Sequence, residues 1–267
     1  MVGLSLYSII PVRAEAREGA EQNTQILFGE TFEILKPSNS QTLKPSQWTQ
    51  VRLDSDGQEG WVDAKMVTSM TAAEYKQHRA ALKNAAMVAF PMAYAMSENN
   101  GQTIPLTAGT RLTNYQDGRF EVLGVGFRID PSMVITQALE MDEQHLLQAV
   151  RFFLNVPYLW GGKNALGMDC SGFTQIVMSL FGKHLLRNAS EQATQGRAIS
   201  HLSKAKAGDL VFFDHEDGKI SHVGIVIDPE RVIHCSGRVK VEKLDTTGIY
   251  NTEQGGYSHH LVAIRRI

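Results

Sequence analysis

Short runs of alternating hydrophobic and polar residues fill the first 70 positions, and turn-forming residues separate the runs. Alternation with a period of two over four to eight residues indicates β-strands with one buried face. The predicted strands cover residues 8–13, 24–30, 31–35, 48–53 and 59–62, with a loop rich in Ser, Asn and Pro at 37–46. Short strands at this spacing are typical of a small closed barrel.

The pattern changes at Thr71, which precedes a helical segment and is followed three residues later by Glu74. This spacing is that of a helix N-terminal capping box. Strand-like runs then return, more weakly, at 88–92, 106–110 and 119–123. We therefore divide the N-terminal part into a first barrel (1–70), a helical linker (71–84) and a second, divergent barrel (85–141).

The remaining residues, 142–267, mix helices with strands. Apolar residues recur at helical spacing after Asp142, up to Phe153, and again from Phe173 to Leu180. Buried strands are predicted at 210–213, 220–227 and 231–236, with a hairpin turn at 228–230 between the last two. The fold class is α+β.

Composition describes an ordinary globular protein, with 43% hydrophobic and 20% charged residues. A formal net charge of −2 argues against a nucleic-acid or membrane partner. No run of 18 apolar residues occurs. The first residues lack a basic n-region and a long apolar h-region, so we expect a cytoplasmic protein, or a periplasmic one if a leader has been removed.

Cys170 lies where a loop rich in aromatic residues and glycine becomes the first turn of a helix. Free N–H groups and the helix dipole lower the pKa of a thiol at such a position, which favours a nucleophilic thiolate. The alternative is a small buried side chain, as most free cysteines are. The other cysteine, Cys235, falls beside the same candidate site, and clustered metal ligands are absent, so we expect no metal.

Two histidines favour the catalytic interpretation of Cys170 over the structural one. His222 and His234 fall on the two strands joined by the 228–230 turn, which can place them side by side on one face. A helix-start thiol, an imidazole base and a second polar group that orients the base form a nucleophilic system. The remaining strand and loop histidines have no comparable setting, and we expect them at the surface: His184, His201, His215, His259 and His260.

The segments DCSGFTQ, ISHVGIVI and VIHCSG, in this order, resemble the NlpC-type cell-wall cysteine peptidases. The resemblance implies a papain-like catalytic domain over about 142–267. It makes Cys170 the nucleophile, His222 the base and His234 the orienting residue, with the Tyr158 hydroxyl near the oxyanion. The N-terminal run that ends in GWV resembles a bacterial SH3-like domain.

Two SH3-like units before such a domain resemble the γ-D-glutamyl-L-diamino acid endopeptidases. The resemblance implies a muropeptide substrate, L-Ala-γ-D-Glu-diaminopimelate or -Lys, whose free ammonium is held by Glu21, Asp169 and Ser190. Arg187, Ser171, Trp160 and Trp61 are further substrate-binding candidates. Asp169 could instead cap the helix, and Gln58 stands where the family has a tyrosine.

Two other functions stay open at this point. One is an exported hydrolase of intact peptidoglycan, whose SH3-like domains bind the wall. The other is a wall-binding module without catalysis, which the joint presence of Cys170, His222 and His234 disfavours. We expect no organic cofactor and a monomer.

Overall fold

The protein is described by a computed structural model that covers residues 1–36, 47–214 and 218–267. The loop predicted at 37–46 and His215 lie outside these residues. The chain divides into two compact units, Met1–Gln137 and Ala138–Ile267. No helix in the described ranges is both long and apolar enough to cross a membrane.

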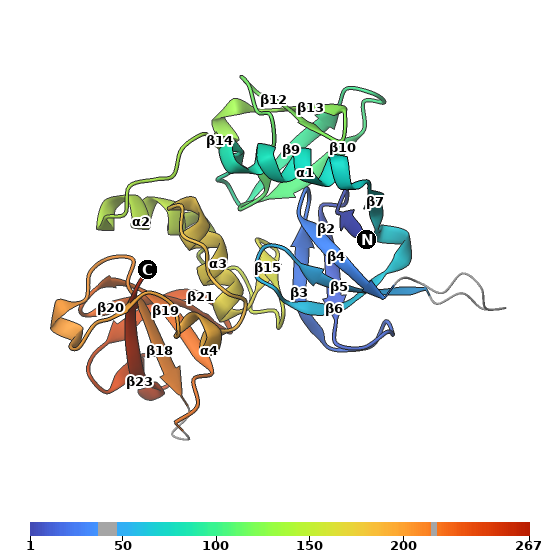
Figure 1. Cartoon of the computed structure of the whole chain (residues 1–267). Helices are drawn as coiled ribbons and strands as arrows, with labels where there is room; N and C mark the ends of the chain where they lie inside the picture. The colour runs from blue at the N-terminus through green and yellow to red at the C-terminus, as the bar shows by residue number, and fades with distance from the viewer. Residues whose placement is uncertain (37–46, 215–217) are drawn as a thin grey trace. The chain divides into compact units, whose positions relative to one another are not determined.

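The first unit begins with an antiparallel sheet in the order β3-β2-β6-β5-β4-β1-β7 (Figure 1). Its strands are β1 (Val2–Leu4), β2 (Ile9–Arg13), β3 (Gln22–Leu27), β4 (Thr31–Lys36), β5 (Trp48–Leu53), β6 (Glu59–Asp63) and β7 (Thr68–Met70), with a 3-10 turn at Ala64–Met66. Alternate residues such as Ile10, Val12 and Val51 fill its core. The five strands predicted here are confirmed, while β1 and β7 were not predicted.

The close approach of two strands explains why the GWV segment begins with a glycine, Gly60. A Cβ at this position would lie 2.5 Å from Val12 Cγ1 and 2.7 Å from the Arg13 carbonyl oxygen. Only glycine lets β6 approach β2 this closely, which is a common reason for a glycine inside a strand.

Helix α1 (Ala72–Ala81) follows, and the predicted capping box is present. The Thr71 hydroxyl accepts from the Glu74 N–H at 3.2 Å, and the Glu74 carboxylate accepts from the Thr71 N–H at 2.7 Å. A 3-10 turn (Leu82–Asn84) ends the linker.

The second β part of this unit forms two small sheets, β10-β9-β13-β12 and β11-β8-β14. The strands are β8 (Ala86–Val88), β9 (Met92–Ser97), β10 (Thr103–Thr107), β11 (Arg111–Leu112), β12 (Arg119–Val122), β13 (Val125–Ile129) and β14 (Val134–Ile135), with a 3-10 turn at Pro131–Met133. Phe28, in the turn that follows β3, packs edge-on against Phe120 and Phe127. The two β parts therefore share one core.

The second unit contains helices α2 (Glu143–Val150), α3 (Cys170–Leu180) and α4 (Ala189–Gln192), with 3-10 turns at Arg151–Phe153 and Leu202–Lys204. Its strands are β15 (Lys163–Asn164), β16 (Gly167–Met168), β17 (Arg197–Ala198), β18 (Leu210–Asp214), β19 (His222–Asp228), β20 (Arg231–Ser236), β21 (Arg238–Leu244), β22 (Gly248–Asn251) and β23 (Gly256–Arg266). Strands β18 to β23 close into a six-stranded barrel through the β22–β23 pairing.

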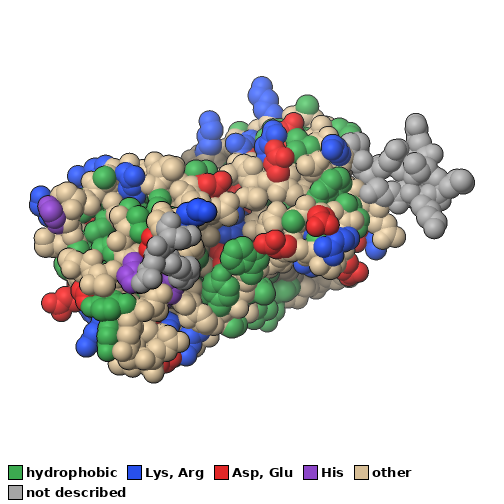
Figure 2. Space-filling model, turned by 90° about the horizontal axis from the view of Figure 1, so that it is seen from below, with side chains coloured by type: hydrophobic (Ala, Val, Ile, Leu, Met, Phe, Trp, Pro, Cys, Tyr) green, Lys and Arg blue, Asp and Glu red, His purple; other side chains and the backbone are tan. Residues whose placement is uncertain are grey.

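Helix α3 packs against β19 and β20, so Cys170 lies near the two histidine strands (Figure 1). The predicted architecture, a helix-borne cysteine on an antiparallel sheet that small β domains precede in the chain, is confirmed. Figure 2 shows basic and acidic side chains interspersed over the visible face, in keeping with the low net charge.

Candidate active site

Cys170 is the first residue of α3, as the sequence predicts, and Asp169 caps the helix. Asp169 Oδ1 accepts from the Gly172 N–H at 2.7 Å. The glycine of the DCSG segment is required here because a Cβ on Gly172 would collide with the carbonyl oxygen of Gly162. The loop that carries Gly162 is thereby held directly against the first turn of the cysteine helix.

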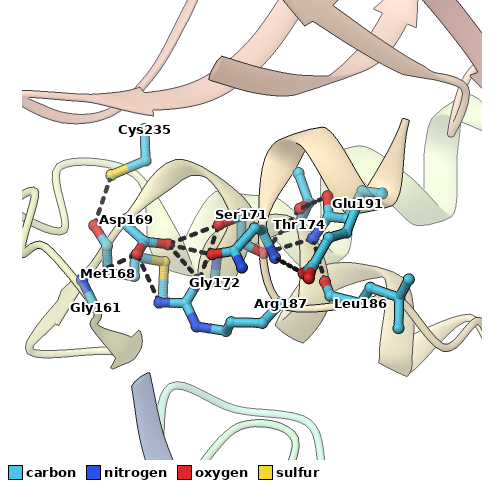
Figure 3. A network of polar contacts seen from close by, with 12 residues as sticks. Gly161, Met168, Asp169, Ser171, Gly172, Thr174, Leu186, Arg187, Glu191 and Cys235 are labelled. Carbon is cyan, nitrogen blue, oxygen red and sulfur yellow. Dashed lines mark hydrogen bonds and ion pairs between the residues drawn. The ribbon is translucent and has the colours of Figure 1, made fainter. Parts of the chain in front are cut away.

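Asp169 is held in turn by Arg187, which is 1% exposed. Arg187 Nη1 donates to Asp169 Oδ1 at 3.0 Å, and Arg187 Nη2 donates to Asp169 Oδ2 at 2.6 Å. Figure 3 shows the Arg187 side chain reaching toward Asp169 and Ser171. The Gly161 N–H also donates to Asp169 Oδ2, at 3.0 Å. The bidentate pair of Arg187 and Asp169 therefore positions the loop around Cys170.

These contacts favour the capping interpretation of Asp169 over direct binding of a substrate amine. The carboxylate is 7% exposed, and both of its oxygens already accept from the chain. Arg187 likewise directs its guanidinium at Asp169 and at the hydroxyl of Ser171, 2.8 Å away. Both residues position the cysteine loop, and their binding of substrate stays a prediction.

A buried amide ties the same turn to α4. Gln192 Oε1 accepts from the Thr174 hydroxyl at 2.8 Å, and Gln192 Nε2 donates to the Ser171 carbonyl oxygen at 3.1 Å. Asn188 caps α4, while Ser190, an expected ammonium ligand, is exposed on it. The sequence analysis did not single out Gln192.

The expected low pKa of Cys170 is not what the structure gives. Burial, and then the charge of Asp169, raise the pKa of the Cys170 thiol to about 12. The Val223 and Ser171 N–H groups donate hydrogen bonds to the sulphur and oppose this rise. The sequence indicated the helix start correctly but gave no measure of desolvation, which outweighs it here. A thiolate at Cys170 therefore needs a nearby cation.

The two predicted histidines are in contact. His222 Nε2 and His234 Nδ1 lie 2.8 Å apart, and the rings are nearly perpendicular. His222 directly precedes Val223, whose N–H reaches the Cys170 sulphur. His234 Nε2 lies 2.8 Å from Glu242 Oε2. Glu242 Oε1 lies 3.1 Å from Lys240 Nζ. We call this series, from His222 through His234 to Glu242, the relay.

Burial lowers the pKa of His234, which is fully buried, although its bond to Glu242 acts in the other direction. Burial would raise the pKa of Glu242, but hydrogen bonds from His234 and Lys240 lower it overall. Glu242 is therefore a carboxylate, and the series is built to support a positive charge on an imidazole.

The prediction that His259 lies at the surface is wrong. His259 is buried in β23, and its ring lies 4.2 Å from that of His222, tilted by 31°. The closure of the barrel by β23 brings it there, and a His-His pair near the C-terminus carries no signal for this packing. His184 and His201 are exposed as predicted, and His260 is half-buried.

Tyr158 precedes the cysteine loop and pairs with Met168 in a parallel bridge. Burial, and then the proximity of Cys170, raise the pKa of Tyr158. Its hydroxyl therefore stays protonated and can donate a hydrogen bond. Trp160, two residues on, is 60% exposed and can offer an aromatic surface to a ligand.

The remaining expected ligands, Glu21 and Trp61, belong to the first unit. Glu21 is exposed just before β3, and Trp61 is half-buried on β6, opposite Arg13. Among the described residues, no group of three or more histidine, cysteine, aspartate or glutamate side chains could hold a metal.

A buried thiol on a helix start, beside a pair of bonded imidazoles, defines a cysteine hydrolase of papain-like fold. The comparisons agree. A model described as the NlpC/P60 family matches residues 155–266, and a model described as the bacterial dipeptidyl-peptidase Sh3 domain matches residues 12–66.

A gamma-D-glutamyl-L-lysine dipeptidyl-peptidase of Bacillus subtilis (strain 168) is 31% identical over 258 residues, 91% of this chain and 80% of that protein. A probable endopeptidase p60 of Listeria innocua is 38% identical over 39% of this chain and 22% of that protein. The crystal structure of an NlpC/P60 family protein from Bacillus cereus has a TM-score of 0.80 at 19% identity and covers 100% of this chain and 99% of that chain, which shows the fold. The chain belongs to the NlpC/P60 family, and it is a cysteine endopeptidase of the peptidoglycan-hydrolysing class.

Proposed function

We propose that the protein hydrolyses the γ-D-glutamyl–diamino acid bond of peptidoglycan stem peptides that carry a free N-terminal L-Ala. The observation that carries the chemistry is the bonded pair of His222 and His234, with the backbone beside His222 reaching the Cys170 sulphur. His222 takes the Cys170 proton, and the resulting imidazolium offsets the cost of a buried thiolate.

The reaction is an acyl transfer. The Cys170 sulphur forms a bond to the γ-carbonyl carbon of D-glutamate, and the bond from that carbon to the diamino acid nitrogen breaks. His222 gives its proton to the leaving amine, and His234 keeps the His222 ring in its orientation. Water, activated by His222, then cleaves the thioester.

The oxyanion of each tetrahedral intermediate is stabilised by the Cys170 N–H at the start of α3 and by the Tyr158 hydroxyl. Each such donor contributes about 3 kcal/mol to the transition state. The raised pKa of Tyr158 supports this role because only the protonated phenol donates.

The proposed substrate class is supported by similarity along most of the chain. The Bacillus subtilis relative matches 91% of it, which includes the first β part as well as the catalytic unit. Of the ammonium ligands that the resemblance implies, Asp169 is hydrogen-bonded to Arg187 and to the helix cap, while Glu21 and Ser190 are exposed. We further propose that the enzyme acts on released wall fragments in the cytoplasm.

The test compares L-Ala-γ-D-Glu-diaminopimelate and its -Lys counterpart with their N-acetylated forms, with products identified by mass spectrometry. We expect release of L-Ala-D-Glu from the free peptides only, and no product with Cys170→Ala. Glu21→Gln should raise KM for the free peptide.

Equal cleavage of free and acetylated peptides would retain the cysteine mechanism and remove the amine requirement. That result would favour the alternative, hydrolysis of intact wall, in which the SH3-like domains bind peptidoglycan. Cleavage of neither peptide would favour the binding-module alternative.

A further inference from the structure

Glu242 extends the paired histidines by one more residue. Strand β21 runs antiparallel to β20, with Lys240 opposite His234 and Glu242 opposite Val232. Glu242 therefore reaches His234 diagonally, two residues along its strand, and lies on the same face of the sheet. The Glu242 side chain is 7% exposed, so this carboxylate is buried against the imidazole.

The chemistry of these groups fixes the direction of the hydrogen bonds. An ionised carboxylate only accepts, so His234 Nε2 carries a proton and donates to Glu242. A neutral imidazole has one donor and one acceptor nitrogen, so His234 Nδ1 accepts from His222 Nε2. The same rule makes His222 Nδ1 a proton acceptor, which is the state that a base for the Cys170 thiol needs.

We propose that Glu242 is a positioning residue that sets the tautomers of His234 and His222 and stabilises the imidazolium formed when Cys170 loses its proton. The inference deepens the proposed function, because it names the group that keeps the base ready. It also gives Lys240 a modulating role. Lys240 Nζ lies 3.1 Å from Glu242 Oε1, so its positive charge offsets part of the negative charge that acts on His234.

Several other titratable groups lie near the two imidazoles. They come from α3, β20, β21 and β23: Cys170, Cys235, Lys240, Glu242 and His259. Two substitutions, Glu242→Gln and Lys240→Met, change charge of opposite sign on a single strand and leave the others in place. They form a matched pair.

The wild-type protein provides the first measurement, which needs no substrate. Long-range proton–nitrogen NMR correlations distinguish the imidazole tautomers. We expect the proton of neutral His234 on Nε2 and that of neutral His222 on Nε2. A proton on His234 Nδ1 would overturn the proposal, whatever the variants do.

The second measurement is the rate at which iodoacetamide alkylates Cys170 at pH 7, located by mass spectrometry to separate it from Cys235. In Glu242→Gln, the amide group can donate to His234 Nε2 and so reverse the direction of the hydrogen bonds from His234 to His222. We expect alkylation about tenfold slower, less than the full effect of a general base because His222 is still present. Lys240→Met keeps the carboxylate, and alkylation should be at least as fast as in the wild type.

The same variants are then compared in cleavage of L-Ala-γ-D-Glu-L-Lys. Glu242→Gln should lower kcat by about tenfold with little change in KM, and move the basic limb of the pH profile of kcat/KM to lower pH. Lys240→Met should move that limb to higher pH, which a merely structural role of Glu242 does not predict. If Glu242→Gln fails to fold, slower alkylation in Lys240→Met than in the wild type would still overturn the proposal.

These readouts separate the two levels of inference. If the wild type cleaves no muropeptide yet has the expected tautomers and alkylation rates, the proposed function fails and the role of Glu242 stands. If the peptide is cleaved and Glu242→Gln matches the wild type in tautomers, alkylation and kcat, the proposed function stands and the role of Glu242 fails.

Discussion

Asp169 and Arg187, at the start of the cysteine helix, and the relay of His222, His234 and Glu242 are two buried polar networks with different responses to protons. A guanidinium stays charged at any pH at which the protein is folded. The first network therefore carries fixed charges. The relay contains two imidazoles, which can each gain or lose a proton, and a carboxylate that only accepts. The first network can hold atoms in place, and the second can move a proton.

The difference explains how a thiol with a raised pKa can still be a nucleophile. Asp169 fixes the cap of α3 and the Gly161 N–H, but its negative charge also raises the pKa of Cys170. The Asp169 carboxylate thus positions the start of the cysteine helix but makes the Cys170 thiol less acidic. A proton acceptor that becomes a cation offsets this, and the relay supplies one whose positive charge is supported by Glu242. The Asp169–Arg187 network holds Cys170 in position, and the relay supplies the proton acceptor that this thiol needs.

The largest effect that tests this comparison is expected on the fixed-charge network. Arg187→Leu leaves the Asp169 carboxylate buried without its cation, which costs about 3–5 kcal/mol of the free energy of unfolding. Hydrogen exchange of the α3 amides, followed by mass spectrometry, measures this loss locally in the full chain. Activity should disappear together with the protection of α3.

Arg238→Leu is the matched control, because Arg238 forms its ion pair with Glu253 where both side chains are about half exposed or more. Such pairs contribute about 0–1 kcal/mol, so protection of α3 should be unchanged. Similar losses in the two variants would mean that the Asp169–Arg187 pair does not hold the cysteine helix.

A smaller effect is expected when the relay is displaced without a change of charge. Gly224 lies opposite His234 on β19, and a Cβ there would lie 2.5 Å from Val232 Cγ2 and 3.1 Å from His234 Cβ. Gly224→Ala should cost about 1–3 kcal/mol of stability through overpacking. Because the strain acts on His234, kcat should fall while KM stays near its wild-type value.

Gly256→Ala serves as the control for that substitution, since a Cβ at Gly256 meets no atom within 4 Å. Stability should stay within about 0.5 kcal/mol of the wild type, with kcat unchanged. A Gly224→Ala enzyme of normal kcat would show that the relay tolerates a shift of His234.

The sequence predicted those parts of the site that follow from local pattern. Cys170 at a helix start can be found from the change in periodicity, and the hairpin turn at 228–230 brings His222 and His234 to one face. The register of this hairpin shifts at a β-bulge between Val226 and Asp228, and this shift pairs His234 with Gly224 and so places it on the same face as His222. The turn could be predicted from the sequence, whereas the bulge was not. The roles of these residues in the reaction stay predictions.

The other parts depend on contacts between distant segments. Glu242 lies eight residues beyond His234, in an alternating strand (β21) whose outward residues resemble any solvated face. His259 reaches His222 only because β23 closes the barrel. Burial of Cys170 likewise depends on the whole unit, and it reversed the expected direction of the pKa shift. A pattern along the chain gives position, while desolvation is a property of the packed structure.

The smallest expected effect is the dependence of stability on pH, and it separates the two networks most directly. Burial lowers the pKa of His234 below its ordinary value of 6.5. The unfolded chain therefore binds a proton more readily than the folded protein. Stability is then greatest above pH 6.5 and declines as pH falls below it, by at most about 1.4 kcal/mol per pH unit for one group.

Urea unfolding from pH 8 to pH 5 measures this slope, and His234→Gln provides the comparison. Whatever the substitution does to stability at pH 8, the decline toward pH 5 should be shallower in the variant, because one titrating group has been removed. A steeper decline in the variant would mean that His234 is protonated in the folded protein. Glu242 would then hold an imidazolium in the resting enzyme, and the relay would resemble the Asp169–Arg187 pair as a source of fixed charge.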